Sequence, residues 1–102
     1  MKTVAETIKK IDEALLAGHY VLMELNNPRY TLSTDIEKVG FDGNAVWVYR
    51  YYGDDEPMFT LFTDSTFYGE EVEFEDGTEV YLVSDSLDPL LVDFLISDSK
   101  NI

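Results

Sequence analysis

The chain has 102 residues, the length of one domain, and 45% of them are apolar and 14% aromatic, so it is not a disordered acidic tail. Its formal net charge at pH 7 is −14, and it contains no cysteine, which excludes disulfides and thiolate chemistry. The N-terminus lacks the apolar stretch of a signal peptide, and the apolar runs are too short to span a membrane. We therefore expect a single cytoplasmic domain over residues 1–102 with no membrane partner.

The charge is unevenly distributed along the chain. Residues 1–50 hold seven acidic and six basic residues, whereas residues 51–102 hold fourteen acidic residues and one basic residue, a net charge of −13. A surface that served only solubility would intersperse the two signs. The segregation therefore favours a basic partner, with a purely solubilising surface as the alternative interpretation.

The first element is an N-terminal helix. Thr3 and Glu6 form a T-x-x-E capping box, and Gly18 is placed to end the helix, which predicts a helix over Val4–Ala17. The apolar residues that share one helical face are Val4, Ile8, Ile11 and Leu15.

Alternating apolar residues then predict strands. Tyr20–Leu25 and Tyr30–Glu37 alternate regularly, and the alternation changes phase at Lys38, which indicates a bulge or a strand break. Asp42-Gly43-Asn44 predicts a tight reversal into Ala45–Tyr52, which is apolar on both faces and so expected to be a central strand.

The second half predicts another strand and a hairpin. Met58–Thr63 fits a strand, and Glu71–Phe74 and Thr78–Val83 fit a hairpin. A three-residue loop, Glu75-Asp76-Gly77 with Gly77 left-handed, would place the hairpin's apolar residues on one face. Those apolar residues are Val72, Phe74, Val80 and Leu82.

A short C-terminal helix is expected next. Asp88 would cap it and Pro89 would occupy its first position. Its apolar face would consist of Leu90, Leu91, Phe94 and Leu95, and residues 97–102 would be a frayed tail. The predicted fold class is α+β, with an N-terminal helix, an antiparallel sheet of about five to six strands and this C-terminal helix.

The hairpin carries the strongest functional signal. Glu71, Glu73 and Glu75 alternate with apolar residues, so their carboxylates would point away from the core about 6.6 Å apart. This spacing is comparable to the path between neighbouring phosphates of a nucleic-acid strand. In the expected register Glu73 lies opposite Glu79, which is repulsive. An edge hairpin that uses charge to prevent aggregation is the competing interpretation.

The candidate partner-binding residues are Asp54, Asp55, Glu56, Asp64, Glu70, Glu71, Glu73, Glu75, Asp76, Glu79 and Tyr81.

Signatures of catalysis and of cofactor or metal binding are missing from the sequence. It has no nucleophilic cysteine, G-x-S-x-G, P-loop or G-x-G-x-x-G, and its one histidine, His19, excludes a His-rich zinc site. The run Asp54-Asp55-Glu56 is interpreted as a solvated turn rather than a cation site. We expect no enzyme activity, no catalytic residue, no cofactor and no metal.

The layout resembles a class of proteins without matching a motif. Small size, no cysteine, a helix before a small sheet, and the acids of Asp54–Asp64 and Glu70–Glu79 are similar to small acidic phage-encoded inhibitors of nucleic-acid enzymes, of the anti-CRISPR, anti-restriction and DNA-mimic types. The resemblance implies a nuclease target. The near-neutral first half departs from the most evenly acidic mimics.

The expected function is therefore inhibition of a nucleic-acid-binding protein or nuclease by occupation of its basic groove. Direct binding to nucleic acid is not expected, because an acidic face repels phosphate. One alternative is an immunity protein or antitoxin that masks a toxin nuclease. A second alternative is an accessory phage protein that self-assembles through tyrosines and a strand edge.

Overall fold

A computed structural model describes residues 2–27, 30–84 and 91–97. Over these residues the chain forms one helix and eight strands. The elements are α1 (Val4–Leu16), β1 (Val21–Asn27), β2 (Tyr30–Asp35), β3 (Lys38–Phe41), β4 (Ala45–Tyr49), β5 (Phe59–Phe62), β6 (Phe67–Phe74), β7 (Gly77–Ser84) and β8 (Leu91–Ser97).

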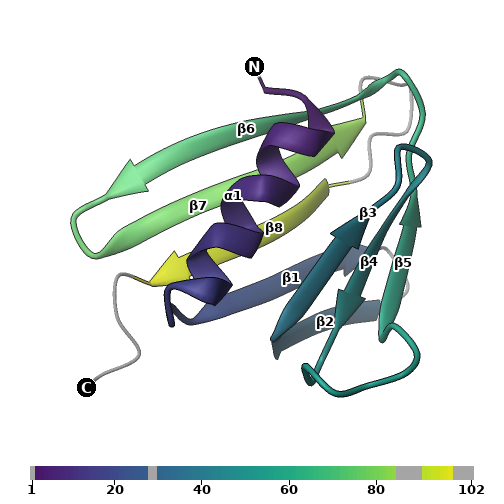
Figure 1. The fold of residues 1–102 in the computed structure, drawn as a ribbon. Coiled ribbons are helices and arrows are strands. Elements are labelled where there is room, and N and C mark those ends of the chain that lie inside the picture. The colour runs from purple at the N-terminus through teal and green to yellow at the C-terminus, as the bar shows by residue number, and fades with distance from the viewer. Residues whose placement is uncertain (1, 28–29, 85–90, 98–102) are drawn as a thin grey trace.

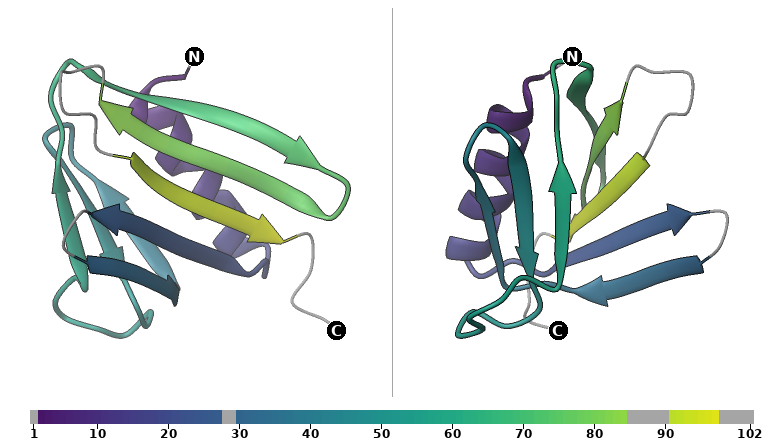
Figure 2. Two further views of the ribbon diagram at one scale, coloured as in Figure 1. Left: turned by 180° about the vertical axis from the view of Figure 1, so that it is seen from behind. Right: turned by 90° about the vertical axis from the view of Figure 1, so that its right-hand side faces the viewer.

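The elements form two layers (Figure 1). One layer is a five-stranded antiparallel sheet with the order β2-β1-β8-β7-β6. The second layer consists of α1 and a three-stranded sheet with the order β3-β4-β5, which lie side by side against the same face of the large sheet. Seen from behind, the opposite face of the large sheet has no described element on it (Figure 2). Among the described residues, the large sheet is therefore packed on one face and open on the other.

The core lies between the two layers. The large sheet supplies buried residues from β1, β7 and β8, and Met23, Leu82, Val92 and Phe94 are fully buried. From the second layer, α1 and the small sheet contribute the side chains that face them. The second-layer residues are Val4, Ile8, Ile11, Val39, Val46, Val48 and Leu61.

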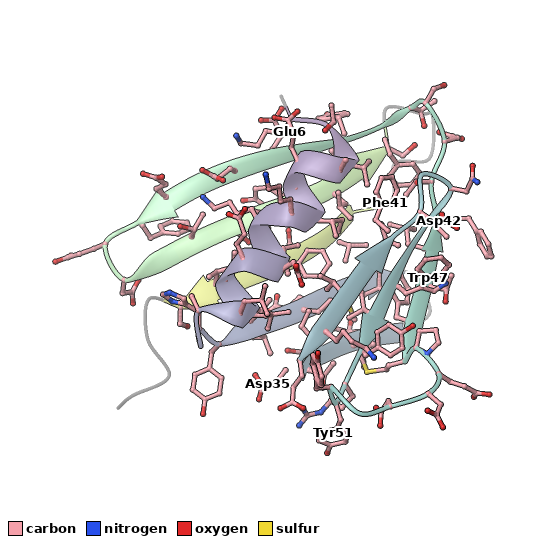
Figure 3. The ribbon with its side chains drawn as sticks, viewed as in Figure 1. Glu6, Asp35, Phe41, Asp42, Trp47 and Tyr51 are labelled. Atoms are coloured by element: carbon pink, nitrogen blue, oxygen red, sulfur yellow. The ribbon has the colours of Figure 1, made fainter. Side chains whose placement is uncertain are left out.

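The start of α1 confirms the predicted capping box. The Thr3 side chain accepts a hydrogen bond from the Glu6 N–H at 3.0 Å, and the Thr3 N–H donates to Glu6 Oε1 at 3.1 Å. Glu6 lies at the N-terminal end of the helix (Figure 3). At the other end Ala17 is the cap residue and Gly18 has a φ of 85°, so the helix ends one residue earlier than predicted.

A close approach at Gly69 fixes α1 on β6. A Cβ at Gly69 would lie 1.8 Å from Thr7 Oγ1, and Thr7 is only 1% exposed. Backbone hydrogen bonds between Lys2 and Gly69, at 2.7 and 2.8 Å, add to this contact. Gly69 therefore faces the helix, and the alternate residues of β6 face the same way.

The predicted change of phase near Lys38 is confirmed as a strand break. The Ile36 N–H donates to Val21 O of the large sheet, and the Glu37 N–H donates to Tyr49 O of the small sheet, both at 3.0 Å. The chain thus passes from one layer to the other between β2 and β3. The reversal at Gly43, whose φ is 97°, and the central position of β4 are also as predicted.

The predicted C-terminal helix is wrong, and so is the α+β fold class with one sheet of five to six strands. Leu91–Ser97 forms β8, the central strand of the large sheet, hydrogen-bonded to β1 on one side and β7 on the other. Val92, Phe94 and Ile96 alternate into the core, at 0%, 0% and 8% exposure. This short apolar run fits the helical and the strand period equally, and pairing on both sides decided between them. Asp88, Pro89 and residues 98–102 lie outside the described residues.

The predicted hairpin register is also wrong. The β6–β7 turn has two residues, so Phe74 pairs with Gly77, Glu73 with Thr78 and Val72 with Glu79. One residue fewer in the loop moves each side chain of β6 to the opposite face. Gly77 is not left-handed. Its lack of a side chain serves a close approach instead, because a Cβ there would lie 2.2 Å from the Ile96 carbonyl oxygen of β8.

Candidate functional site: the open face of the large sheet

The open face consists of the residues of the five large-sheet strands that alternate with the buried ones. On β1, for example, Met23 and Leu25 point into the core, so Glu24 points to the open face. On β8, Asp93 lies between the fully buried Val92 and Phe94 and points the same way.

Every strand of the large sheet contributes one described carboxylate to the open face. We call this set the acidic band; it consists of Asp35 on β2, Glu24 on β1, Asp93 on β8, Glu79 on β7 and Glu70 on β6. Neighbouring strands are about 4.8 Å apart, so the band crosses the sheet over about 19 Å. It occupies two adjacent cross-strand rows, with Glu70, Asp93 and Glu24 in one row and Glu79 and Asp35 in the other. Asp35, at the end of β2, is labelled in Figure 3.

Asp93 lies at the centre of the band and has the most perturbed environment. In the cross-strand register it stands between Tyr81 on β7 and Glu24 on β1. Partial burial raises the pKa of Asp93 to about 6, and repulsion by Glu79 and then Glu24 adds to this effect. Its Oδ1 atom is buried and has no hydrogen-bond partner. Ionisation of this carboxylate therefore lowers the stability of the folded protein, and a cation bound beside it would offset that loss.

Glu79 is held in place by its neighbour on β7. The Tyr81 hydroxyl donates a hydrogen bond to Glu79 Oε1 at 2.7 Å, and this bond raises the pKa of Tyr81 to about 12. One carboxylate oxygen of Glu79 is thus oriented by a rigid aromatic side chain.

Apolar side chains lie beside and among the carboxylates of the acidic band. Val72 and Phe74 on β6 are 40% and 56% exposed. Toward the opposite edge of the sheet, a shallow hollow is lined by Tyr20, Leu22, Asp35, Leu95 and Ser97. The open face is therefore acidic and apolar, and its described residues include no lysine or arginine.

The described basic side chains lie on the second layer. Lys2, Lys9 and Lys10 line a hollow beside α1. On the small sheet and the connection that follows β4, the Lys38 ammonium lies 4.2 Å from the centre of the Tyr49 ring and the Arg50 guanidinium 4.6 Å from the Tyr51 ring. Tyr51 lies at the end of the small sheet where this connection begins (Figure 3). The described basic side chains are thus confined to the second layer, where acidic side chains such as Glu13 also lie, and the described open face is acidic without basic residues.

The structure distributes the predicted partner-binding residues over several surfaces. Glu70, Glu79 and Tyr81 lie together on the open face. Glu71 lies on the covered face, where its Oε1 is 2.8 Å from Lys10 Nζ of α1, and Glu73 shares that side of β6. Glu71 therefore neutralises a helix lysine.

The remaining predicted acids lie in connections. Asp54, Asp55 and Glu56 belong to the β4–β5 connection, where Asp54 Oδ2 accepts a hydrogen bond from the Tyr51 N–H at 3.2 Å. Asp64 Oδ1 accepts hydrogen bonds from the Thr66 hydroxyl and N–H, at 2.5 and 2.8 Å, and these bonds lower its pKa. The hairpin turn itself consists of Glu75 and Asp76. None of these six joins the acidic band.

Sequence reasoning missed three members of the acidic band, namely Glu24, Asp35 and Asp93. Glu24 and Asp93 carried a usable signal, because each stands between two apolar residues. Asp93 was not recognised because its segment was assigned to a helix, in which it would have been a solvated residue beside the apolar face.

Over the described residues, no group of three or more His, Cys, Asp and Glu side chains is arranged to hold a metal ion. No helix in the same ranges is long and apolar enough to cross a membrane. The described chain is a two-layer, mostly β protein with an acidic open sheet face. No protein-family model matches the chain, and no curated protein or solved structure matches it either.

Proposed function

We propose that this protein binds a basic protein partner through the open face, and that it inhibits a nuclease or another nucleic-acid-binding protein by occupying its basic groove. The observation that carries the proposal is the acidic band, with one carboxylate on each strand of a sheet face that no described element covers.

The charge density of the band supports nucleic-acid mimicry. Glu24 and Asp93 are direct cross-strand neighbours, about 5 Å apart, and the other neighbouring carboxylates of the band are diagonal neighbours, about 7–8 Å apart. Each strand of duplex DNA carries one phosphate per about 3.4 Å of helix axis. A groove lined with Lys and Arg for a phosphate strand would therefore meet several charges of the same sign across one face of the protein. The net charge of −14 would steer such a partner toward the protein and speed association at low salt.

The energetics of Asp93 support binding of a cation. This carboxylate is half-buried, lies near Glu24 and Glu79, and has a raised pKa. A Lys or Arg side chain from a partner would offset this repulsion, and a preorganised acceptor loses little entropy on binding.

The test compares two triple variants that remove the same charge. Glu24→Gln/Glu79→Gln/Asp93→Asn removes three carboxylates of the acidic band, and Asp12→Asn/Asp55→Asn/Glu56→Gln removes three exposed ones elsewhere. A nucleic-acid-binding protein captured at low salt should be released at high salt, and the wild type and the control variant should block its nucleic-acid binding. The band variant should fail to block it, mainly through slower association. Equal inhibition by both variants would remove the open face from the proposal.

The immunity-protein or antitoxin alternative uses the same surface, and an adjacent toxin gene would favour it over the inhibitor. The self-assembly alternative has an observation of its own. Phe62, on the edge strand β5, is 78% exposed, and β5 contains no charged residue that would prevent edge pairing. A salt-insensitive oligomer in light scattering would favour self-assembly.

A further inference from the structure

The outer edge of β6 already pairs with another segment of the chain at one position. The N–H and C=O groups of Gly69 exchange hydrogen bonds of 2.7 and 2.8 Å with those of Lys2, and the pairing is antiparallel. Both backbone groups of Gly69 therefore point away from β7. Because this direction alternates along a strand, the backbone groups of Glu71 and Glu73 point to the same outer edge. In Figure 1 the N-terminus lies beside the first half of β6, and no described element lies along the edge of its second half.

The side chains along this open part of the edge are acidic and apolar. Glu71 is paired with Lys10, whereas Glu73 has no ion pair among the described residues. Val72 and Phe74 alternate with these glutamates and are 40% and 56% exposed. A strand added here would meet carboxylates on one face of the sheet and apolar side chains on the other.

The glutamates also decide which strands can pair with this edge. If two copies of the protein paired through β6, glutamates would lie close to glutamates across the new strand pair, and like charges there repel each other. Of the edge strands, only β6 carries more than one acidic residue, and it carries no basic one. The edge therefore disfavours a second copy of this chain and favours a basic strand.

We propose that the second half of the β6 edge binds an extended segment of a basic protein, which adds to the large sheet as an antiparallel strand. A Lys or Arg of this segment lies beside Glu73, and apolar side chains on its other face lie beside Val72 and Phe74. Hydrogen bonds to the backbone of Glu71 and Glu73 supply affinity, and the side chains supply the preference for a basic sequence. The proposal goes beyond the proposed function and does not depend on it, because it concerns a strand edge and not the acidic band.

A capped peptide of about six residues, in which Lys and Val alternate, tests the proposal. In the added strand the lysines pair with Glu71 and Glu73, so their N–H groups point to β6 and those of the valines point away. The same peptide with N-methylated lysines therefore loses its hydrogen bonds to β6, and the peptide with N-methylated valines is the matched control.

The unmodified peptide and the valine-methylated peptide should bind about tenfold more tightly than the lysine-methylated one. In NMR, both should slow hydrogen exchange of the Glu71 and Glu73 amides. Equal affinity of the two methylated peptides, or a preference for the lysine-methylated one, would overturn the proposal and leave the proposed function standing. Unchanged exchange of both amides would overturn it as well.

A pair of variants tests the same edge from the side of the protein. Glu73→Gln and Glu73→Pro both remove the carboxylate, but only Pro also removes the N–H group. That N–H does not bond to β7, so Pro is compatible with the β6–β7 hairpin, and circular dichroism checks the fold. Glu73→Pro should bind the unmodified peptide severalfold more weakly than Glu73→Gln does, and equal affinity of the two folded variants would refute strand addition. The peptide comparison uses the wild-type protein, so it decides the question even if Glu73→Pro does not fold.

Discussion

Replacement of Asp93 by Asn should stabilise the protein above pH 6 and leave its stability unchanged below about pH 4. The pKa of Asp93 is raised from 3.8 to about 6 in the folded state. At pH 3.5 the carboxyl group is mostly protonated in both the folded and the unfolded chain, so Asn is a neutral replacement. As the pH rises from 4 to 6 the unfolded chain releases this proton first, and the folded state of the wild type loses stability.

The size of the effect follows from the shift. About two pKa units correspond to about 3 kcal/mol if the carboxylate were fully shielded from water. Asp93 is only partly buried, and solvent screening reduces this upper limit to about 1 kcal/mol. For a domain of this size that amounts to a rise in Tm of about 5 °C above pH 6.

Urea denaturation of the wild type and Asp93→Asn at a series of pH values measures this difference directly. Asp12→Asn makes the same chemical change at an exposed position of α1 and should alter stability by less than about 0.5 kcal/mol at every pH. The reasoning would be refuted if Asp93→Asn were no more stable than the wild type at pH 7.5. Equal stabilisation at pH 3.5 and 7.5 would refute it as well, because the gain would then not come from the ionised carboxylate.

Three further predictions concern how α1 is held on the sheet. Gly69→Ala should lower the free energy of unfolding by about 1–3 kcal/mol, because the new methyl group collides with Thr7; a denaturation curve with an unchanged midpoint would contradict this. Glu71→Gln should lower the free energy of unfolding by up to about 1 kcal/mol, because it removes the carboxylate beside Lys10. Surface plasmon resonance should show unchanged binding to the partner. A loss of affinity as large as that of the acidic-band variant would place the interface on the covered face. Thr3→Ala should lower the free energy of unfolding by about 1 kcal/mol, because the helix loses its N-terminal cap. A thermal melt measures this loss, and the helical content in circular dichroism should fall as well. An unaltered melt would show that the cap contributes nothing to stability.

Local signals determined the elements whose cause lies within a few neighbouring residues. The capping box that starts α1, the left-handed Gly18 that follows it and the turn at Gly43 all depend on hydrogen bonds or backbone angles of adjacent residues. The alternation of β1 and the break before β3 were predictable for the same reason. In each case the sequence pattern fits one structure much better than its competitors.

Part of the candidate surface could also be predicted from the sequence. The excess of acid in residues 51–102 is a fact of composition, and Glu70, Glu79 and Tyr81 were recognised as candidates that the open face does contain. The face on which each hairpin glutamate lies was not predictable, because it depends on whether the turn has two or three residues. Contacts far away in the sequence, Gly69 against α1 and Gly77 against β8, decided that question.

Only the tertiary structure decided that Leu91–Ser97 is a strand and that the acidic band exists. The five apolar residues of this segment satisfy the helical and the strand period alike, and the hydrogen-bonding edges of β1 and β7 on either side selected the strand. That choice turned Asp93 toward the open face and brought it directly opposite Glu24 and diagonally near Glu79. Carboxylates from positions 24 to 93 became neighbours through the strand order β2-β1-β8-β7-β6, which is set by long-range pairing and by burial of one sheet face, not by any local motif.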